Sequence, residues 1–325
     1  MSDFGTRVGL LKPRWAGANL TGRQSGLRQR LFKARYIYLL LLPGLVYYLF
    51  FHYLPMYGIL MAFKNFNANL GIWGSHWAGL THFEYIFSDP SFLRAFRNTL
   101  FISMGRILFE LPFPILLALL INELREGRSR RILQTLFTFP HFLSWVIIGS
   151  IMLNLFGDQG IVNMMLSSVG LGKIRIFSSS DLFRPFLFFS NIWKESGWSS
   201  IIYLAAIASI DIEQYESAAI DGITRRQKMW YITLPNILPT VVILFILAVG
   251  NAMNAGFDQV FNLYNGAVLD MGDIIDTYIY RITFQGPTDF SFSTAVGLFK
   301  SLINFALLIA ADFASRRLSG KGLFH

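Results

Sequence analysis

The stretch DIEQYESAAIDGITRRQKMWYITLPNILP, residues 211–239, is too polar to cross a membrane, although apolar segments lie on both sides of it. Its first half has helical character and carries three consecutive small residues, Ser217, Ala218 and Ala219. Small side chains allow another surface to approach the backbone closely. Gly222 then permits a tight turn, and a second helical stretch begins at Arg225. The segment therefore predicts an exposed helix–glycine–helix corner for docking a partner. The alternative is an amphipathic helix that lies on the membrane.

The rest of the chain has a composition that is unusual for a soluble protein. Of its 325 residues, 54% are hydrophobic and only 14% are charged, whereas soluble domains carry about 25% charged residues. The mean hydropathy is +0.47. These values exclude a disordered chain and predict an all-α polytopic membrane protein. The absence of cysteine excludes disulfides, thiol nucleophiles and thiolate metal sites.

Six apolar segments are long enough to cross a bilayer. We expect membrane-spanning helices at about residues 36–63, 98–121, 132–156, 182–210, 240–263 and 292–313. The chain is then divided into a basic tail over 1–35, a six-helix domain over 36–313 that includes the 211–239 segment, and a C-terminal tail over 314–325.

The distribution of basic residues predicts the orientation. Eighteen of the 28 lysines and arginines lie in the tails and even-numbered connections, against six in the odd-numbered connections. Because basic loops stay in the cytoplasm, we expect both termini and the 211–239 segment to be cytoplasmic. Topology thus accounts for the net charge of +9. A nucleic-acid-binding tail is the alternative, and we expect no nucleic-acid partner.

The spacing within residues 211–239 resembles a known motif. The pattern Glu-x-Ala, three residues, Gly, nine residues, Ile-x-Leu-Pro resembles the coupling helix of permease subunits of ATP-binding-cassette (ABC) importers. It is met at Glu216, Ala218, Gly222, Ile232, Leu234 and Pro235, with Ser217 in place of the usual alanine. An aspartate directly before the glycine, here Asp221, resembles the motif of the carbohydrate-importing branch of these permeases. The resemblance covers about 36–313 and implies the type I, maltose-importer-like permease fold. It also implies that Glu216, Ser217, Ala218, Ala219, Asp221 and Gly222 contact an ATPase.

The same resemblance implies a set of partners in a bacterial inner membrane. These are a second homologous permease, two ATPase subunits that bind ATP and Mg, a soluble periplasmic sugar-binding protein, and the bilayer. We expect no cofactor and no enzymatic activity in this chain. Residues 170–174, GLGKI, lack the first glycine and the final Ser/Thr of a phosphate-binding P-loop. The five histidines are scattered, and their spacing predicts no metal site.

Polar residues inside the expected spans are candidates for a substrate pathway, since such residues usually face protein or water. In the 240–263 span they are Asn251, Asn254, Asp258 and Asn262, at steps that predict a single helical face. Their side chains can bond sugar hydroxyls. Hydrogen bonding between helices is the alternative.

The 182–210 span carries a second group of candidates, Asn191, Lys194 and Trp198, again on one face. Glu195 points about 100° away from Lys194 on a helix, so we expect it to be a poor partner. Lys194 is then available for an anionic substrate or for Asp258, and Trp198 for stacking on a sugar ring. Arg106 and Glu110, four residues apart, are read as a structural pair. His141 follows Pro140, which predicts a bend.

The C-terminal half resembles permeases that import uronate-containing oligosaccharides. The segments that carry the resemblance are FDQVFNLYN (257–265), DIIDTYIYR (273–281) and TAVGLFKS (294–301). The whole chain is similar to the first permease subunit of bacterial alginate importers. This implies an acidic oligosaccharide as substrate, with Lys194, and also Lys300 or Arg281, as charge partners. Asp258 would repel such a substrate unless it is paired, so a neutral oligosaccharide stays open.

An ion-coupled secondary transporter is the rival class, and a membrane-embedded enzyme is a third.

Overall fold

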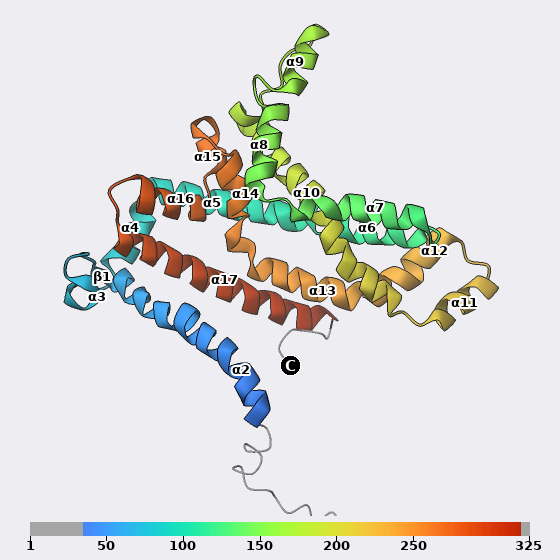
Figure 1. Cartoon of the computed structure of the whole chain (residues 1–325), viewed down its shortest axis with the longest axis horizontal. Coiled ribbons are helices and arrows are strands. Elements are labelled where there is room, and N and C mark those ends of the chain that lie inside the picture. The colour runs from blue at the N-terminus through green and yellow to red at the C-terminus, as the bar shows by residue number, and fades with distance from the viewer. Residues whose placement is uncertain (1–34, 320–325) are drawn as a thin grey trace, which may run out of the picture. The chain divides into compact units, whose positions relative to one another are not determined.

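The computed structural model describes residues 35–319 and, over this range, is helical apart from one short β-pairing (Figure 1). Most of the predicted 1–35 tail and the last six residues lie outside the described range. The chain divides into two units, one ending at Gly58 and one beginning at Ile59. The described part of the first unit holds α2 (Arg35–Tyr48), the π-helical η1 (Leu49–Tyr53) and the start of the 3₁₀ segment η2 (Leu54–Phe63). Its side chains from 35 to 57 are all exposed.

The second unit begins with a compact connection. β1 (Lys64–Asn65) pairs antiparallel with β2 (His76–Trp77), and α3 (Gly71–Gly74) and α4 (Thr81–Ser88) lie in the same connection. The elements up to α10 are α5 (Pro90–Gly105), the π-helical η3 (Arg106–Glu110), α6 (Pro112–Glu123), α7 (Arg128–Thr138), η4 (Phe139–Phe142), α8 (Trp145–Phe156), α9 (Ile161–Ser168), η5 (Ile176–Ser178) and α10 (Ser180–Ala208).

The remaining elements follow the 211–239 segment quoted above into the C-terminal half. They are α11 (Ile212–Ile220), α12 (Arg225–Lys228), the π-helical η6 (Met229–Thr233), α13 (Leu234–Gly250), η7 (Ala252–Asn254), α14 (Phe257–Leu263), η8 (Gly266–Val268), α15 (Leu269–Gly272), α16 (Ile275–Tyr280), the π-helical η9 (Arg281–Gln285) and α17 (Phe290–Ser319). The predicted last span therefore continues as helix into the predicted C-terminal tail.

Five helical stretches among the described residues are long and apolar enough to cross a membrane. They are Arg35–Phe63, Pro90–Glu123, Trp145–Ser168, Arg225–Gly250 and Phe290–Arg317. The remaining long helix, α10, has 29 residues and carries four charged ones, including Lys194 and Glu195. It coincides with the expected span at 182–210. The all-helical, multi-pass character is confirmed, and the count of six spans stays a prediction.

The predicted span over 132–156, with a bend at Pro140, is interrupted more severely than predicted. The helix ends at Thr138, passes through η4, and restarts as α8 at Trp145. Pro140 supplies no backbone N–H, and the Ser144 hydroxyl caps α8 by accepting from the N–H of Ile147 at 3.3 Å. A bend predicted at Pro140 is thus a complete break.

The prediction of one continuous helix over 240–263 is wrong. α13 ends at Gly250, and the chain resumes as helix only at Phe257. Between them, Ala255 and Gly256 adopt left-handed φ values of 44° and 74°, which an α-helix cannot accommodate. Asn251, Asn254, Asp258 and Asn262 therefore do not share one helical face, and the periodicity argument for that stripe fails.

α10 packs against α6, α7 and α13, while α13 packs along α17. The approach of α10 to α7 is very close at Gly197. A Cβ atom placed there would lie 2.0 Å from the carbonyl oxygen of Phe137. Glycine at this position is what allows the two helices to meet.

We expect Gly197→Ala to destabilise the protein although alanine favours helices. The added methyl group must push the α7 backbone away, an overpacking cost of about 1–3 kcal/mol. Gly297→Ala in α17 is the matched control, because its Cβ would meet nothing within 4 Å; it should be neutral or stabilising by up to about 1 kcal/mol. Thermal melting of the purified protein measures both. Equal melting temperatures for the two variants would contradict the close approach.

Candidate functional site

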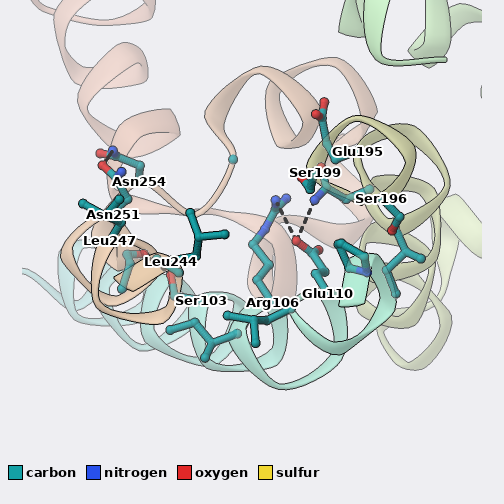
Figure 2. Close-up of a pocket in the computed structure, with 18 of the residues that line it drawn as sticks. Ser103, Arg106, Glu110, Glu195, Ser196, Ser199, Leu244, Leu247, Asn251 and Asn254 are labelled. Atoms are coloured by element: carbon teal, nitrogen blue, oxygen red, sulfur yellow. Dashed lines mark hydrogen bonds and ion pairs between the residues drawn. The ribbon is translucent and has the colours of Figure 1, made fainter. Parts of the chain in front are cut away.

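A first cavity lies beside the break between α13 and α14 (Figure 2). Its volume is about 480 Å³, and its walls come from the α5–α6 segment, α10, and the end of α13. Of the seven predicted pathway residues, Asn191, Asn251 and Asn254 line it. Asn254 donates its side-chain amide to the Asn251 side chain at 3.1 Å, so the break brings these two amides together in a way that a regular helix would not.

A charged pair forms the opposite wall of this first cavity. Arg106 and Glu110 belong to the π-helical η3, and the shortest distance between their charged atoms is 3.6 Å. Pro112 lies two residues after Glu110 and supplies no backbone N–H, so regular helical hydrogen bonding is interrupted here. Asn191 donates to Glu110 at 2.6 Å from α10. Arg106 hydrogen-bonds the Gln259 side chain, which in turn donates to Leu187 O at 2.7 Å. Arg106 thus bridges the break in the chain at Gly256.

Two further cavities, of about 540 and 490 Å³, adjoin the same break. Asn254 is shared by the first and second cavities, and Asp258 by the second and third. Asn262 and Lys194 line the third. The second also presents four aromatic rings, from Trp145, Phe257, Tyr280 and Phe284. The three cavities are therefore lined by six of the seven residues predicted for the substrate pathway. These residues do not share the helical face that the sequence predicted.

Asp258 and Asn262 differ in how they are held. The Asn262 amide donates to the backbone oxygen of Asp258 at 2.7 Å. The Asp258 carboxylate is exposed, and within residues 35–319 it has no hydrogen bond or ion pair. Its negative charge therefore faces the second and third cavities.

The expectation that Glu195 is a poor partner for Lys194 is wrong. Glu195, judged a poor partner, pairs with it at 2.8 Å, and Lys194 also donates to the backbone oxygen of His141 at 2.8 Å. The other oxygen of Glu195 lies 2.7 Å from Nδ1 of His141. The Lys194 and Glu195 side chains both reach His141, next to the break at Pro140. Their charged groups therefore meet although their Cα–Cβ directions differ by about 100°. Lys194 is not paired with Asp258.

Trp198 is placed at the edge of this same cluster. Its ring stacks on that of His141 with centroids 4.5 Å apart and planes 1° from parallel. The side chain is 43% exposed. His141 is thus held from two sides by α10, and the cluster ties the broken helix to α10.

The other two predicted cations also have partners within the chain. Arg281 contacts both oxygens of the buried Asp273, at 3.0 and 2.6 Å. This hydrogen bonding raises the pKa of the Arg281 guanidinium above its ordinary value. Lys300 contacts both oxygens of Asp276, at 2.6 and 2.8 Å. Neither cation is placed as a free charge partner.

The 211–239 segment has the predicted local form. α11 and α12 flank Gly222, whose φ is 71°. Bonds from Gly222 N to Ala219 O and from Ile223 N to Ala218 O close the end of α11. The remaining predicted docking residues, Glu216, Ser217, Ala219 and Asp221, are exposed, and Ala218 is buried. The corner is therefore accessible; its docking role stays a prediction.

α11 is also fastened to the helix that follows it. Tyr215 OH lies 3.1 Å from the Thr233 hydroxyl, and Asn236 donates to the Gln214 side chain at 2.9 Å. Ala218 is the buried residue of α11. We call these two hydrogen bonds the α11 clamp, since they join α11 to η6 and the start of α13.

Several residues at the cavities were not anticipated. Arg106 and Glu110 were read as structural, and Glu195, Trp145 and Tyr280 were not assigned to the pathway. A charged pair at membrane depth was an available signal, because such groups usually mark a functional path. Trp145 and Tyr280 gave no signal, since only the breaks in the flanking helices bring them to the same hollow.

Comparisons with known proteins agree with this architecture. Residues 110–320 match the family described as binding-protein-dependent transport system inner membrane component, and the chain belongs to this family. It is accordingly a multi-pass permease subunit with the type I ABC importer fold, as the resemblance implied.

Particular relatives cover almost the whole chain. Protein LplB of Bacillus subtilis (strain 168) is 42% identical over 315 residues, 96% of this chain and 98% of the relative. The polygalacturonan/rhamnogalacturonan transport system permease protein YteP of the same organism is 41% identical, over 91% of this chain and 92% of the relative. A chain of a bacterial alginate ABC transporter, solved in complex with an alginate pentasaccharide-bound periplasmic protein, has a TM-score of 0.83 and 38% identity, covering 91% of this chain and 99% of that chain.

Proposed function

We propose that this chain forms half of the translocation pathway of an ATP-driven importer for an acidic oligosaccharide such as alginate. The observation that carries the proposal is the likeness to the alginate transporter chain over 99% of that chain's length. YteP, whose name specifies polygalacturonan, points to the same class of uronate polymers. The three cavities at the breaks supply the amides, carboxylate and aromatic rings that sugars contact.

The proposed assembly sits in a bacterial inner membrane with six spans and both termini in the cytoplasm. A second homologous permease completes the pathway, two ATPase subunits bind ATP and Mg, and a soluble periplasmic protein delivers the sugar. The chain itself is not an enzyme. It couples to the ATPase through Glu216, Ser217, Ala218, Ala219, Asp221 and Gly222. The accessibility of that corner and the α11 clamp support this role.

Uptake by proteoliposomes that contain the complete complex tests the proposal. We expect ATP-dependent uptake of a uronate oligosaccharide, several-fold faster than that of its carboxyl-reduced, neutral counterpart of equal length. Uptake by this chain alone, driven by a proton or sodium gradient, would instead establish a secondary transporter. Equal uptake of the two sugars would overturn the acidic substrate and leave the ABC mechanism standing.

A further inference from the structure

Five cations of the second unit differ in how firmly the protein's own groups hold them. Lys194, Arg281 and Lys300 contact a carboxylate at 3.0 Å or less, as described above. Arg184 donates to Met271 O at 3.0 Å and to the Asn98 side chain at 2.8 Å. Each of these four already makes two hydrogen bonds that hold the fold together, and a substrate carboxylate would compete with those partners.

Arg106 is different. Its Nη2 is hydrogen-bonded to Gln259, but its Nη1 lies 3.6 Å from Glu110, beyond ordinary hydrogen-bond distance. Its Nε is buried and has no hydrogen-bond partner within the described residues. The side chain is 16% exposed and lines the first cavity, toward which it rises from η3 (Figure 2). The guanidinium is therefore accessible from the first cavity, and several of its N–H donors have no close hydrogen-bond acceptor.

Glu110 also has a carboxylate oxygen that accepts no hydrogen bond from the described residues. One of its oxygens accepts from Asn191, while the other is buried without a partner among residues 35–319. Glu195, the other acid of this cavity, has both oxygens engaged by Lys194 and His141. The exposed carboxylate of Asp258 lines the second and third cavities but not the first. In the first cavity an anionic group therefore meets a guanidinium with only one close hydrogen-bond partner, Gln259.

We infer that Arg106 binds a carboxylate of the transported oligosaccharide and that Glu110 is the anion it exchanges for that carboxylate. The inference rests on the proposed acidic substrate. In the empty site the loose pair keeps the guanidinium charge compensated, because an isolated charge at this depth is costly. When a uronate enters, Nη1 donates to its carboxylate in a charge-assisted hydrogen bond. Glu110, still held by Asn191, turns its free oxygen to a sugar hydroxyl.

Charge removal from the pair tests the exchange. In Arg106→Gln/Glu110→Gln, both charges disappear together and no buried ion is left alone. We expect the uronate-to-neutral uptake ratio of the proteoliposomes to fall about tenfold, as for the loss of one charge-assisted hydrogen bond. Uptake of the neutral, carboxyl-reduced sugar is the reference in the same proteoliposomes, because it reports any effect of the two substitutions that does not depend on a substrate carboxylate. Co-purification of the subunits shows that the complex is assembled.

Glu110→Gln alone supplies a readout that a purely structural pair would not give. Removing the competing anion should raise the uronate-to-neutral ratio several-fold. Lys173→Gln is the matched control: it removes one exposed cation from the loop after α9, and the ratio should not change.

The outcomes separate this inference from the proposed function. A wild-type complex without preference for the uronate rejects the substrate class before any variant is measured. A wild-type preference that persists in the double variant overturns the role of Arg106. Parallel loss of both sugars in the double variant, with no gain in Glu110→Gln, likewise overturns it and identifies the pair as structural.

Discussion

Replacing Gly222 by valine is expected to reduce ATP-driven uptake by about tenfold or more while the membrane domain stays folded. A β-branched residue at φ 71° costs about 1–2 kcal/mol, and the chain relieves this strain by changing the turn. The change would break the bonds that close α11 at Ala218 and Ala219 and re-aim the proposed docking surface. A Cβ at this glycine would meet nothing within 4 Å, so the effect is conformational rather than steric.

Gly222→Asn is the matched control, because asparagine tolerates the left-handed conformation better than other residues with a side chain. Uptake and stimulated ATPase activity of the reconstituted complex measure both variants, and thermal melting reports the fold. We expect asparagine to retain most of the activity and valine to lose it. Full uptake with Gly222→Val would show that the turn at Gly222 is not needed for coupling, and the assignment of α11 as coupling helix would fail.

Gly256→Ala is expected to have an effect of similar size, on the pathway rather than on coupling. The left-handed φ of 74° is unfavourable for alanine, and the new methyl carbon would lie 2.3 Å from Nη2 of Arg106. Arg106 would then have to leave Gln259, and an unpaired buried polar group costs about 1–3 kcal/mol. We expect lower thermal stability and strongly reduced uptake of every sugar.

Ala255→Gly provides the neighbouring comparison. Ala255 also has a positive φ, of 44°, so glycine relieves strain there, while the loss of one buried methyl group costs about 0.8 kcal/mol. The two terms nearly cancel, and we expect a melting temperature close to that of wild type. Similar stability of Gly256→Ala and Ala255→Gly would contradict the contact between Arg106 and the break.

The sequence predicted where the helices of this protein lie better than it predicted whether each helix is unbroken. Apolar segments of about twenty residues identify helices in a membrane protein because the backbone must satisfy its own hydrogen bonds there. The same rule favours reading each segment as one helix. The breaks at Pro140 and at 251–256 are stabilised by contacts from elsewhere, namely Glu195 with His141 and Ser103 with the backbone of Ala252. Such contacts are invisible to a pattern within one segment.

The site was predictable in part for a related reason. Gly222 and its flanking residues form a local motif, and its form followed from spacing. The pathway residues are polar groups in apolar surroundings, so their identities could be chosen, but their partners could not. Glu195 reaches Lys194 because long side chains have freedom that helical angles do not describe. Arg106 became a candidate only once Gln259 and Gly256 were seen beside it.

The α11 clamp has a mechanical consequence. α13 starts at the clamp and runs 17 residues to Gly250, at the edge of the first cavity. At 1.5 Å per residue it is a rod about 25 Å long, so a tilt of about 10° imposed at one end displaces the other by about 4 Å. That displacement is comparable to the width of a sugar hydroxyl group with its hydrogen bond. α13 thus works as a lever arm. The break after Gly250 is the hinge at which a tilt of α13 would change the shape of the first cavity.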